Sequence, residues 1–319
     1  MLSFSITIFG IYLNAFLFMK LSVHILTYNC ERYIKDALDS VLRQKTTFPF
    51  EIVIGDDASS DNSFSIIEDY AKTHANIKAK KNPENLGILK NFIATLERCS
   101  GDYVFDLAGD DWLSDENALQ ILVDALDKNP TYSFVDSGFD CYFERTGRYR
   151  RNYNKKNMLM SKEEYKTYQK IHGNSFMGCC YRKKMLYDIV DFDDYENKGF
   201  GFEDYPILTD LVMNSDFGLI PKVLSVYRIH RNSHSNSLFS YLKIKLIYAE
   251  KYGFSKTEIA EIYRIDNNSM LHNASLIGDR VNGRKYYRFL RKPIFLNLIY
   301  FISSQNNTAR NVFNFFRKI

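Results

Sequence analysis

The chain has 319 residues, 45% of them hydrophobic, so it is long enough to bury a full core in one large domain or two. Its formal net charge is only +4, but residues 280–319 hold nine Lys or Arg and no Asp or Glu, which leaves −5 on the first 279 residues. The five cysteines form no C-x-x-C pair and no Cys/His cluster. We therefore expect neither a zinc site nor a disulfide framework, and a reducing, cytoplasmic location.

The first 18 residues are uncharged and rich in Phe, Ile and Leu. They resemble the apolar part of a signal peptide or an anchor, but they lack a basic start and a small-residue cleavage site. They also run without a linker into the first predicted strand. We interpret residues 1–18 as the product of a misplaced start, with Met19 as the true beginning, and expect domains at 19–236 and 237–319.

Strand and helix patterns alternate along the chain. We expect strands at 21–26, 50–54, about 77, 103–107, 132–135, 217–220 and 223–227, and helices at 31–44, about 61–74, 88–98, 116–127 and 205–214. Short connections between strands and helices indicate an α/β fold with a mostly parallel sheet in three layers. Residues 140–172 are expected to form a long loop or flap, and residues beyond 237 a C-terminal helical extension.

Two acidic couplets follow two of the predicted strands. Asp56 and Asp57 close the second strand, and Asp110 and Asp111 close the strand at 103–107. The carboxyl ends of strands in open α/β sheets border the ligand crevice. Carboxylates there suggest a nucleotide diphosphate held in part by a divalent cation. An Asx turn with a helix N-cap is the structural alternative for the first couplet, with Asp56 the better candidate for it.

Several nucleotide-binding and metal-binding motifs are absent. The chain contains no G-x-x-x-x-G-K-[ST], no G-x-G-x-x-G and no H-E-x-x-H. A nucleotidyltransferase, one alternative function, usually has a Gly-rich basic loop after the first strand, where this chain has Tyr28-Asn29-Cys30-Glu31. A non-catalytic module that binds a nucleotide sugar is a second alternative.

An ordered set of segments resembles the family 2 glycosyltransferases of the GT-A fold, of the kind that build bacterial polysaccharides and cell-surface glycans. The segments are LSVHILTYNCERYIKDALDSVLRQ, EIVIGDDASSDNS, NPENLGILKNF, GDYVFDLAGDDWLSD and, further on, GFGFEDYPI. The resemblance covers roughly two thirds of the chain. It implies a GT-A three-layer sandwich and inverting transfer of a sugar from a nucleotide-sugar donor, expected to be a UDP-sugar, to a hydroxyl of a glycan or lipid-linked acceptor.

The same resemblance implies roles for residues at the donor site. Thr27, Tyr28 and Asn29 would border the nucleotide, with Tyr28 stacking on the base. Asp57 would accept a hydrogen bond from the base, which favours a pyrimidine with an imide N–H.

The second couplet occupies the position of the D-x-D motif of the family. Asp111 would bind Mg²⁺ or Mn²⁺, and Asp110 would face the ribose or help to hold the cation. Many relatives have an acid where this chain has Ala108, so the cation site has fewer carboxylates here.

Asp204 is the candidate catalytic base, with the neighbouring Glu203 as its competitor. An inverting transfer needs one carboxylate that takes the proton of the acceptor hydroxyl. The structural alternative is a helix N-terminus that is rich in acids because of the helix dipole. Trp112 is expected beside the acceptor site, with core packing as the alternative. His230 and His234 lie in the segment YRIHRNSHS, and the resemblance places His230 or Arg231 near the donor diphosphate, with a surface loop as the alternative.

The C-terminal region is both basic and aromatic. Such a composition suits nucleic acid or an anionic membrane surface, and the plainer alternative is a helical layer with solvated lysines. Because the acceptors of the family are often lipid-linked, we expect no nucleic acid and a reversible contact with the inner face of the cell membrane. No oligomeric state is predicted.

Overall fold

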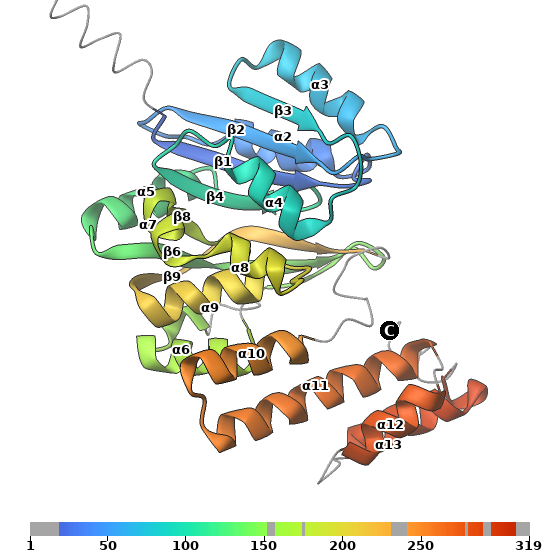
Figure 1. Ribbon diagram of the computed structural model, residues 1–319. Coiled ribbons are helices and arrows are strands. Elements are labelled where there is room, and N and C mark those ends of the chain that lie inside the picture. Colours follow the sequence, from blue (N-terminus) through green and yellow to red (C-terminus); the bar gives the residue numbers. More distant parts are fainter. Residues whose placement is uncertain are drawn as a thin grey trace, which may run out of the picture. The chain divides into compact units, whose positions relative to one another are not determined.

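The computed structural model describes residues 19–151, 157–173, 176–230, 241–277, 280–289 and 295–310 (Figure 1). The chain divides into two compact units. The first comprises Met1–Tyr165 and Asn174–Arg228, and the second comprises Lys166–Gly173 and Ile229–Ile319. The hypothesis of a misplaced start concerns residues 1–18, which lie outside the described residues.

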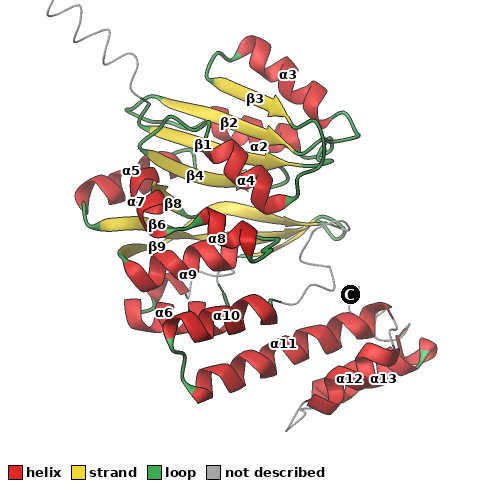
Figure 2. Cartoon of the chain, in the orientation of Figure 1, coloured by secondary structure: helices red, strands yellow, loops and turns green. Residues whose placement is uncertain are grey.

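The first unit contains one mixed sheet with helices on both of its faces (Figure 2). Its strands are β1 (Leu21–Thr27), β2 (Phe50–Asp56), β3 (Ile77–Lys81), β4 (Tyr103–Ala108), β5 (Trp112–Leu113), β6 (Tyr132–Phe143), β7 (Arg148–Arg150), β8 (Cys180–Arg182) and β9 (Asp216–Ile229). Its helices are α2 (Ile34–Leu42), α3 (Ser63–Thr73), α4 (Ile88–Leu96), α5 (Ala118–Lys128), the short 3₁₀ helix Asn157–Leu159, α7 (Lys183–Ile189), α8 (Phe192–Asn197) and α9 (Asp204–Asn214). The expected α/β fold is confirmed.

The strand order is β3-β2-β1-β4-β8-β6-β9-β5, with β7 paired to β6. The first four strands are parallel, whereas β8 pairs antiparallel with both β4 and β6, and β5 pairs antiparallel with β9. Helices α2 and α4 cover opposite faces of the parallel half (Figure 1). On one face of these strands Val23, Ile25, Ile52, Ile54 and Phe105 are at most 1% exposed. The opposite face is buried as well, and it combines apolar with polar side chains: Ser22, His24, Val53 and Val104.

The register of the parallel strands brings their carboxyl ends to one edge. Thr27 at the end of β1 lies opposite Asp56 of β2, and Leu26 lies opposite Ala108 of β4. The segments that follow these three strands therefore start side by side, and they are the ones that carry the predicted donor-site residues.

The prediction of a flap at residues 140–172 is wrong. Strand β6 continues to Phe143, β7 follows at Arg148–Arg150, and α6 spans Lys162–Ile171. The polar composition concealed this helix, which begins with a capping box: Ser161 N–H donates to Glu164 Oε2 at 2.8 Å, and Glu164 N–H donates back to Ser161 Oγ at 3.3 Å. The capping box and the buried ring of Tyr165 stabilise α6. The helix was not predicted because it lacks the stripe of apolar residues by which a sequence pattern identifies a helix.

Other boundaries also differ from the prediction. The two strands expected at 217–220 and 223–227 form one strand, β9, because Pro221 stands within a strand that continues without a turn. Strand β6 is longer than predicted because it buries polar side chains, among them Asp136, which accepts a hydrogen bond from Tyr165 Oη at 2.7 Å. Strand β8 and helices α7 and α8 were not predicted.

The second unit is helical, as expected for the C-terminal extension. Besides most of α6 it contains α10 (Leu242–Tyr252), α11 (Lys256–Ile277), α12 (Arg280–Phe289) and α13 (Phe295–Gln305). Gly253, with φ +64°, ends α10 in the left-handed conformation that glycine adopts without strain. Helices α12 and α13 pack on α11 and on each other. Within the described residues, no helix has an apolar run long enough to cross a membrane.

Candidate active site

The carboxyl edge of the parallel strands is held together by backbone hydrogen bonds between the segments that leave it. Asp57 N–H donates to Thr27 O at 2.9 Å, and Gly109 N–H donates to Leu26 O at 2.8 Å. A Cβ at Gly109 would lie 2.9 Å from Thr27 Cβ, so only glycine lets the acidic segment lie so close to β1. The structure thus brings Thr27, Asp57 and the second couplet to one edge of the sheet.

Both carboxylates of the first couplet, Asp56 and Asp57, accept hydrogen bonds from other residues of the chain. Asp56 is buried and accepts from Ser59 N–H at 2.9 Å and from Ser59 Oγ at 2.6 Å. Its role is thus structural, although the bond goes to the residue three positions on rather than two, as in an Asx turn. Asp57 is 5% exposed and accepts from Leu86 N–H, Gly87 N–H and Asn82 Nδ2 at 2.8, 2.9 and 3.0 Å. Since a carboxylate offers about four acceptor positions, the binding of a base by Asp57 stays a prediction.

The segment after β1 differs in how its residues are presented. Thr27 is buried, whereas Tyr28 is 49% exposed, and a ring so exposed at the site edge is available for stacking. Asn29 has φ +52° and its Oδ1 accepts from Ser60 N–H at 2.8 Å. Asn29 therefore connects the segment after β1 to the segment after β2 and holds the two segments together.

The second couplet is anchored by an arginine that the sequence analysis did not single out. Arg228 of β9 donates its backbone N–H to Asp111 Oδ1 at 2.7 Å and its Nε–H to the backbone oxygen of Asp110 at 2.8 Å. Its Nη2 pairs with Asp36 Oδ2 of α2 at 2.6 Å. The one available signal was a charged residue within the apolar run of β9, V-Y-R-I.

The couplet has the electrostatic character of a cation site. Burial first, and then the charge of Asp110, raise the pKa of the Asp111 carboxyl well above its usual value, while Arg228 opposes this. Asp111 is 3% exposed and Asp110 is partly exposed. A divalent cation would offset both the burial and the repulsion. Among the described residues no three or more His, Cys, Asp or Glu side chains cluster, so the pair fits a cation that takes its remaining ligands from phosphate and water.

The two candidate bases stand at the start of α9. Asp204 is its first residue and Glu203 its N-cap, with Pro206 in the first turn, where proline is tolerated. Glu203 Oε2 is buried and has no hydrogen-bond partner among the described residues. Burial, and then the charge of Asp204, raise the pKa of Glu203 to about 8. A protonated Glu203 cannot accept a proton, so Asp204 remains the better candidate base.

The start of α9 lies close to the strand that carries the second couplet. The charge of Asp106 on β4 also raises the pKa of Glu203. Asp106 is part of a buried network, because its Oδ1 bonds to His24 Nδ1 at 2.6 Å and accepts from Tyr181 Oη at 3.1 Å. A charge network beneath the site thus connects β1, β4, β8 and α9.

Trp112 and His230 are the last two predicted site residues, and neither lies among the residues that end β1 and β2. Trp112, on β5 directly after the couplet, is half-buried and lines a pocket beside α2, so it is not a core residue. His230 follows β9 directly and belongs to the second unit, so its contact with the diphosphate stays a prediction. Arg231 and His234 lie outside the described residues.

These features define an α/β protein in which the predicted donor-site residues meet at the carboxyl edge of the parallel strands, beside a pair of acids suited to a hard cation. Residues 22–190, more than half of the chain, match the model of the family described as Glycosyl transferase family 2. The chain belongs to this family.

Two relatives are similar to the chain over different lengths. An uncharacterized glycosyltransferase of Haemophilus influenzae is 25% identical over 308 residues, which cover 88% of this chain and 90% of that protein. A Mycobacterium tuberculosis protein is 36% identical over 111 residues, or 34% of this chain, and the match spans about a third of that relative, 32% of its length.

Two solved structures show the fold. Staphylococcus aureus TarS 1–349 in complex with UDP-GlcNAc has a TM-score of 0.59 at 18% identity, covering 94% of this chain and 92% of that one. The mannosyltransferase PcManGT of Pyrobaculum calidifontis, in complex with GDP-Man and Mn²⁺, has a TM-score of 0.57 at 16% identity, covering 94% and 89%. The expected GT-A fold is confirmed.

The raised pKa of Glu203 predicts a pH-dependent loss of stability. The pKa is about 8 in the folded protein against an ordinary 4.5, so between these values the unfolded chain is ionised while the folded carboxyl still holds a proton. The folded state binds more protons in this window, and stability falls as pH rises through it. Glu203→Gln removes this loss, so its melting temperature minus that of the wild type should increase from about pH 5 to about pH 8.

Thermal unfolding in chelator, without nucleotide, measures this difference. Glu196→Gln on the exposed side of α8 is the matched control and should give a difference that does not depend on pH. A Glu203→Gln difference that is equally flat would show that Glu203 is ionised in the folded protein.

Proposed function

We propose that the protein is an inverting, metal-dependent glycosyltransferase that moves a sugar from a nucleotide-sugar donor, a UDP-sugar, to a hydroxyl of a glycan or lipid-linked acceptor in the synthesis of cell-surface polysaccharide. The observation that carries the proposal is that Thr27, Tyr28 and Asp57 lie at the carboxyl edge of the parallel strands with the buried acidic pair, while the candidate base Asp204 begins α9. Family membership supports glycosyl transfer, and the nucleotide-sugar complexes of TarS and PcManGT support the donor class.

The donor nucleotide is assigned to the ends of β1 and β2. The exposed ring of Tyr28 stacks on the base, Thr27 borders the ribose, and Asn29 fixes the segment that carries them. Asp57 accepts from the imide N–H of the base with its remaining acceptor capacity, which favours uracil or thymine.

The donor diphosphate is assigned to the second couplet. Asp110 and Asp111 hold the cation, Mg²⁺ or Mn²⁺, and Asp110 presents its partly exposed carboxylate to the ribose and the phosphates. When bound, the cation supplies Lewis-acid stabilisation of the negative charge on the leaving diphosphate. Arg228 keeps the couplet in place through its bonds to Asp111 Oδ1 and to the Asp110 backbone oxygen.

Proton transfer is assigned to the start of α9. The Asp204 carboxylate accepts the proton of the acceptor hydroxyl while the hydroxyl oxygen bonds to the anomeric carbon. The bond from this carbon to the diphosphate oxygen breaks on the opposite face, and the configuration inverts. Glu203 stays protonated beside Asp204, where a second negative charge would be costly.

Asp111→Asn tests the cation site. The amide oxygen of asparagine can still accept the hydrogen bond from Arg228 N–H, so the fold is expected to survive, while the loss of charge removes a strong ligand for a hard cation. We expect Mn²⁺ to strengthen UDP binding to the wild type and to have no effect on UDP binding to this variant, measured by calorimetry. Asp188→Asn on α7 is the control. An unchanged Mn²⁺ dependence in Asp111→Asn would refute the assignment.

Asp204→Asn tests the base. We expect near-normal UDP binding and a loss of transfer on the order of 10² to 10⁴, the usual contribution of a positioned general base. Glu203→Gln, measured beside it, should lose much less because Glu203 already holds a proton near pH 7. Full transfer by Asp204→Asn, or a larger loss in Glu203→Gln, would move the role to another residue.

We further propose that the helical unit binds reversibly to the inner face of the cell membrane. Helix α12 carries Arg280, Arg284 and Lys285 together with Val281, which is 78% exposed. On α13, Leu298 and Ile302 are 39% and 44% exposed. Exposed apolar side chains beside basic ones suit the headgroup region of an anionic bilayer.

Some aromatic rings of this region have a structural role instead. Phe301 stacks on Tyr287 with ring centroids 4.5 Å apart, and Tyr300 contacts His272 of α11 at the same distance. Phe313 and Phe316 lie outside the described residues. The membrane contact is therefore assigned to the basic and aliphatic side chains of α12 and α13.

The double variant Arg280→Glu/Lys285→Glu tests the membrane contact. Each basic residue near an anionic surface contributes about 1 kcal/mol of attraction, so two charge reversals should reduce binding at least tenfold. Co-sedimentation with vesicles that contain phosphatidylserine, at low salt, measures it. Lys251→Glu/Lys256→Glu, in the same unit, is the matched control. Equal binding by both double variants, or no binding by the wild type, would contradict the proposal.

A further inference from the structure

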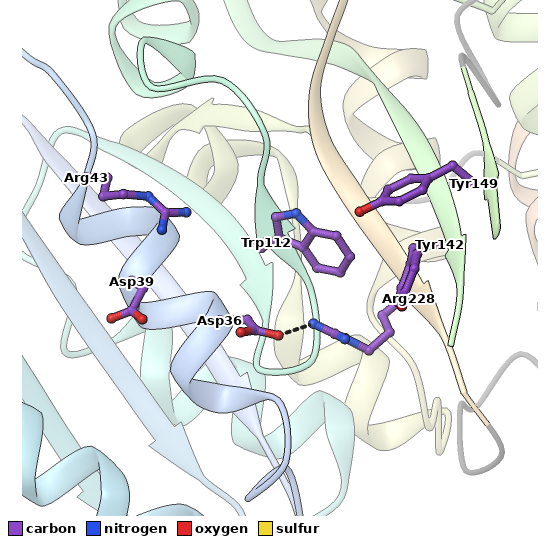
Figure 3. Close-up of a pocket in the computed structure, with 7 residues that line it drawn as sticks. All are labelled: Asp36, Asp39, Arg43, Trp112, Tyr142, Tyr149 and Arg228. Carbon is purple, nitrogen blue, oxygen red and sulfur yellow. Dashed lines mark hydrogen bonds and ion pairs between the residues drawn. The ribbon is translucent and has the colours of Figure 1, made fainter. Parts of the chain in front are cut away.

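A concave site lies on the α2 side of the first unit. It is a pocket of about 320 Å³, at the small end of the range for ligand pockets, about 300–1,000 Å³. Figure 3 shows that its side chains come from α2, β5, β6, β7 and β9. The lining residues are Asp36, Asp39, Arg43, Trp112, Tyr142, Tyr149 and Arg228.

One wall of the pocket is aromatic. Tyr142 and Tyr149 are opposite each other in the β6–β7 ladder, with ring centroids 4.8 Å apart. Trp112 meets Tyr142 edge-on at 5.6 Å. The hairpin and β5 thus hold three rings side by side. Because Tyr149 is 42% exposed and Trp112 is half-buried, ring surface remains accessible.

The other wall is a polar stripe on α2. Asp36, Asp39 and Arg43 follow one another at intervals of three and four residues, which places them on one face of the helix. The apolar residues of α2 face the core. Asp36 and Arg43 point toward Trp112 and Arg228 (Figure 3), whereas Asp39 Oδ1 accepts a hydrogen bond from Tyr70 Oη of α3 at 2.8 Å. With Arg228, the pocket contains two carboxylates and two guanidinium groups, and its formal charge is zero.

We propose that this pocket binds a sugar ring of the acceptor glycan that is distant from the reacting hydroxyl. The pocket lies on the α2 face of the sheet, whereas Asp106, whose charge acts on Glu203 beside Asp204, bonds to His24 on the opposite face, where His24 contacts α4. A sugar ring has C–H-rich faces that pack on aromatic rings, and hydroxyls that both donate to carboxylates and accept from guanidinium groups. A balanced set of charges favours a neutral polyhydroxylated ligand over a phosphate or a cation. The proposal rests on the proposed function, because it supplies the acceptor side of the transfer.

Arg228 places this sugar site next to the second couplet. Its side chain is buried against rings, with the guanidinium carbon 4.5 Å from the centre of the Trp112 ring and 4.8 Å from that of Tyr33. The same side chain bonds to Asp36 in the pocket wall and to the backbone of Asp110. A sugar on the aromatic wall therefore contacts the residues that position the couplet, and Trp112 itself directly follows Asp111.

Trp112 is the only tryptophan of the chain, so its fluorescence reports on this pocket alone. We would titrate the full-length protein with cellobiose, maltose, lactose and N,N′-diacetylchitobiose, with excitation selective for tryptophan. At least one disaccharide should change the emission saturably, in the millimolar range, without UDP or metal. If none of them does, the proposal is overturned.

Tyr149→Ala identifies the site of binding. We expect it to weaken the disaccharide affinity at least fivefold, while Tyr263→Ala on α11, an equally exposed tyrosine at 43% against 42%, should leave it unchanged. An unchanged affinity in Tyr149→Ala would overturn the proposal. So would an emission change produced by UDP alone and lost in Tyr149→Ala, since the pocket would then take the nucleotide.

The proposed function is tested separately by calorimetry of UDP with Mn²⁺ on the wild type. Disaccharide binding without UDP binding would refute the donor assignment and leave the sugar pocket standing. UDP binding without disaccharide binding would refute the sugar pocket and leave the donor assignment standing.

Discussion

The hydrogen bond from the Arg228 backbone to the Asp111 carboxylate is the contact on which the rest of the site depends. It joins residues 117 positions apart and fixes the segment after β4 against β9. A buried carboxylate needs such donors, because an unsatisfied one costs several kcal/mol. The bond leaves the pair Asp110 and Asp111 held in place but electrostatically strained, since burial and mutual repulsion raise the pKa of Asp111. We propose that a cation relieves that strain and that the donor diphosphate binds at this couplet.

The two halves of the sheet give separate places to the two proposed substrates, the nucleotide-sugar donor and the acceptor glycan. The parallel half ends at the carboxyl edge where Tyr28 and Asp57 lie, and we propose that the nucleotide binds there. The antiparallel half contains β5, β6, β7 and β9. Arg228 stands between them, with its backbone on the couplet and its side chain among the rings of the pocket. The donor is thus assigned to one side of the couplet and the acceptor sugar to the other, with Asp204 at the start of α9 as the base.

The sequence predicts those parts of the structure that depend on residues close together in the chain. Strands β1, β2 and β4 have large apolar residues at alternate positions, and the couplets at the ends of β2 and β4 follow from the chain order alone. Helix α6 was missed because a capping box and the buried Tyr165 stabilise it without an apolar stripe. Arg228 was missed because its role lies in contacts with residues more than a hundred positions away. The choice between Asp204 and Glu203 also needed burial, which no local pattern encodes.

The most direct test of the account is the release of nucleoside diphosphate from a panel of UDP-, GDP- and dTDP-sugars by the purified full-length protein with Mn²⁺. The account predicts release from at least one UDP-sugar, dependent on Mn²⁺ and faster with a disaccharide acceptor, with an inverted anomeric carbon in the product by nuclear magnetic resonance. Retention of configuration, or no release from any donor in the panel, would contradict it.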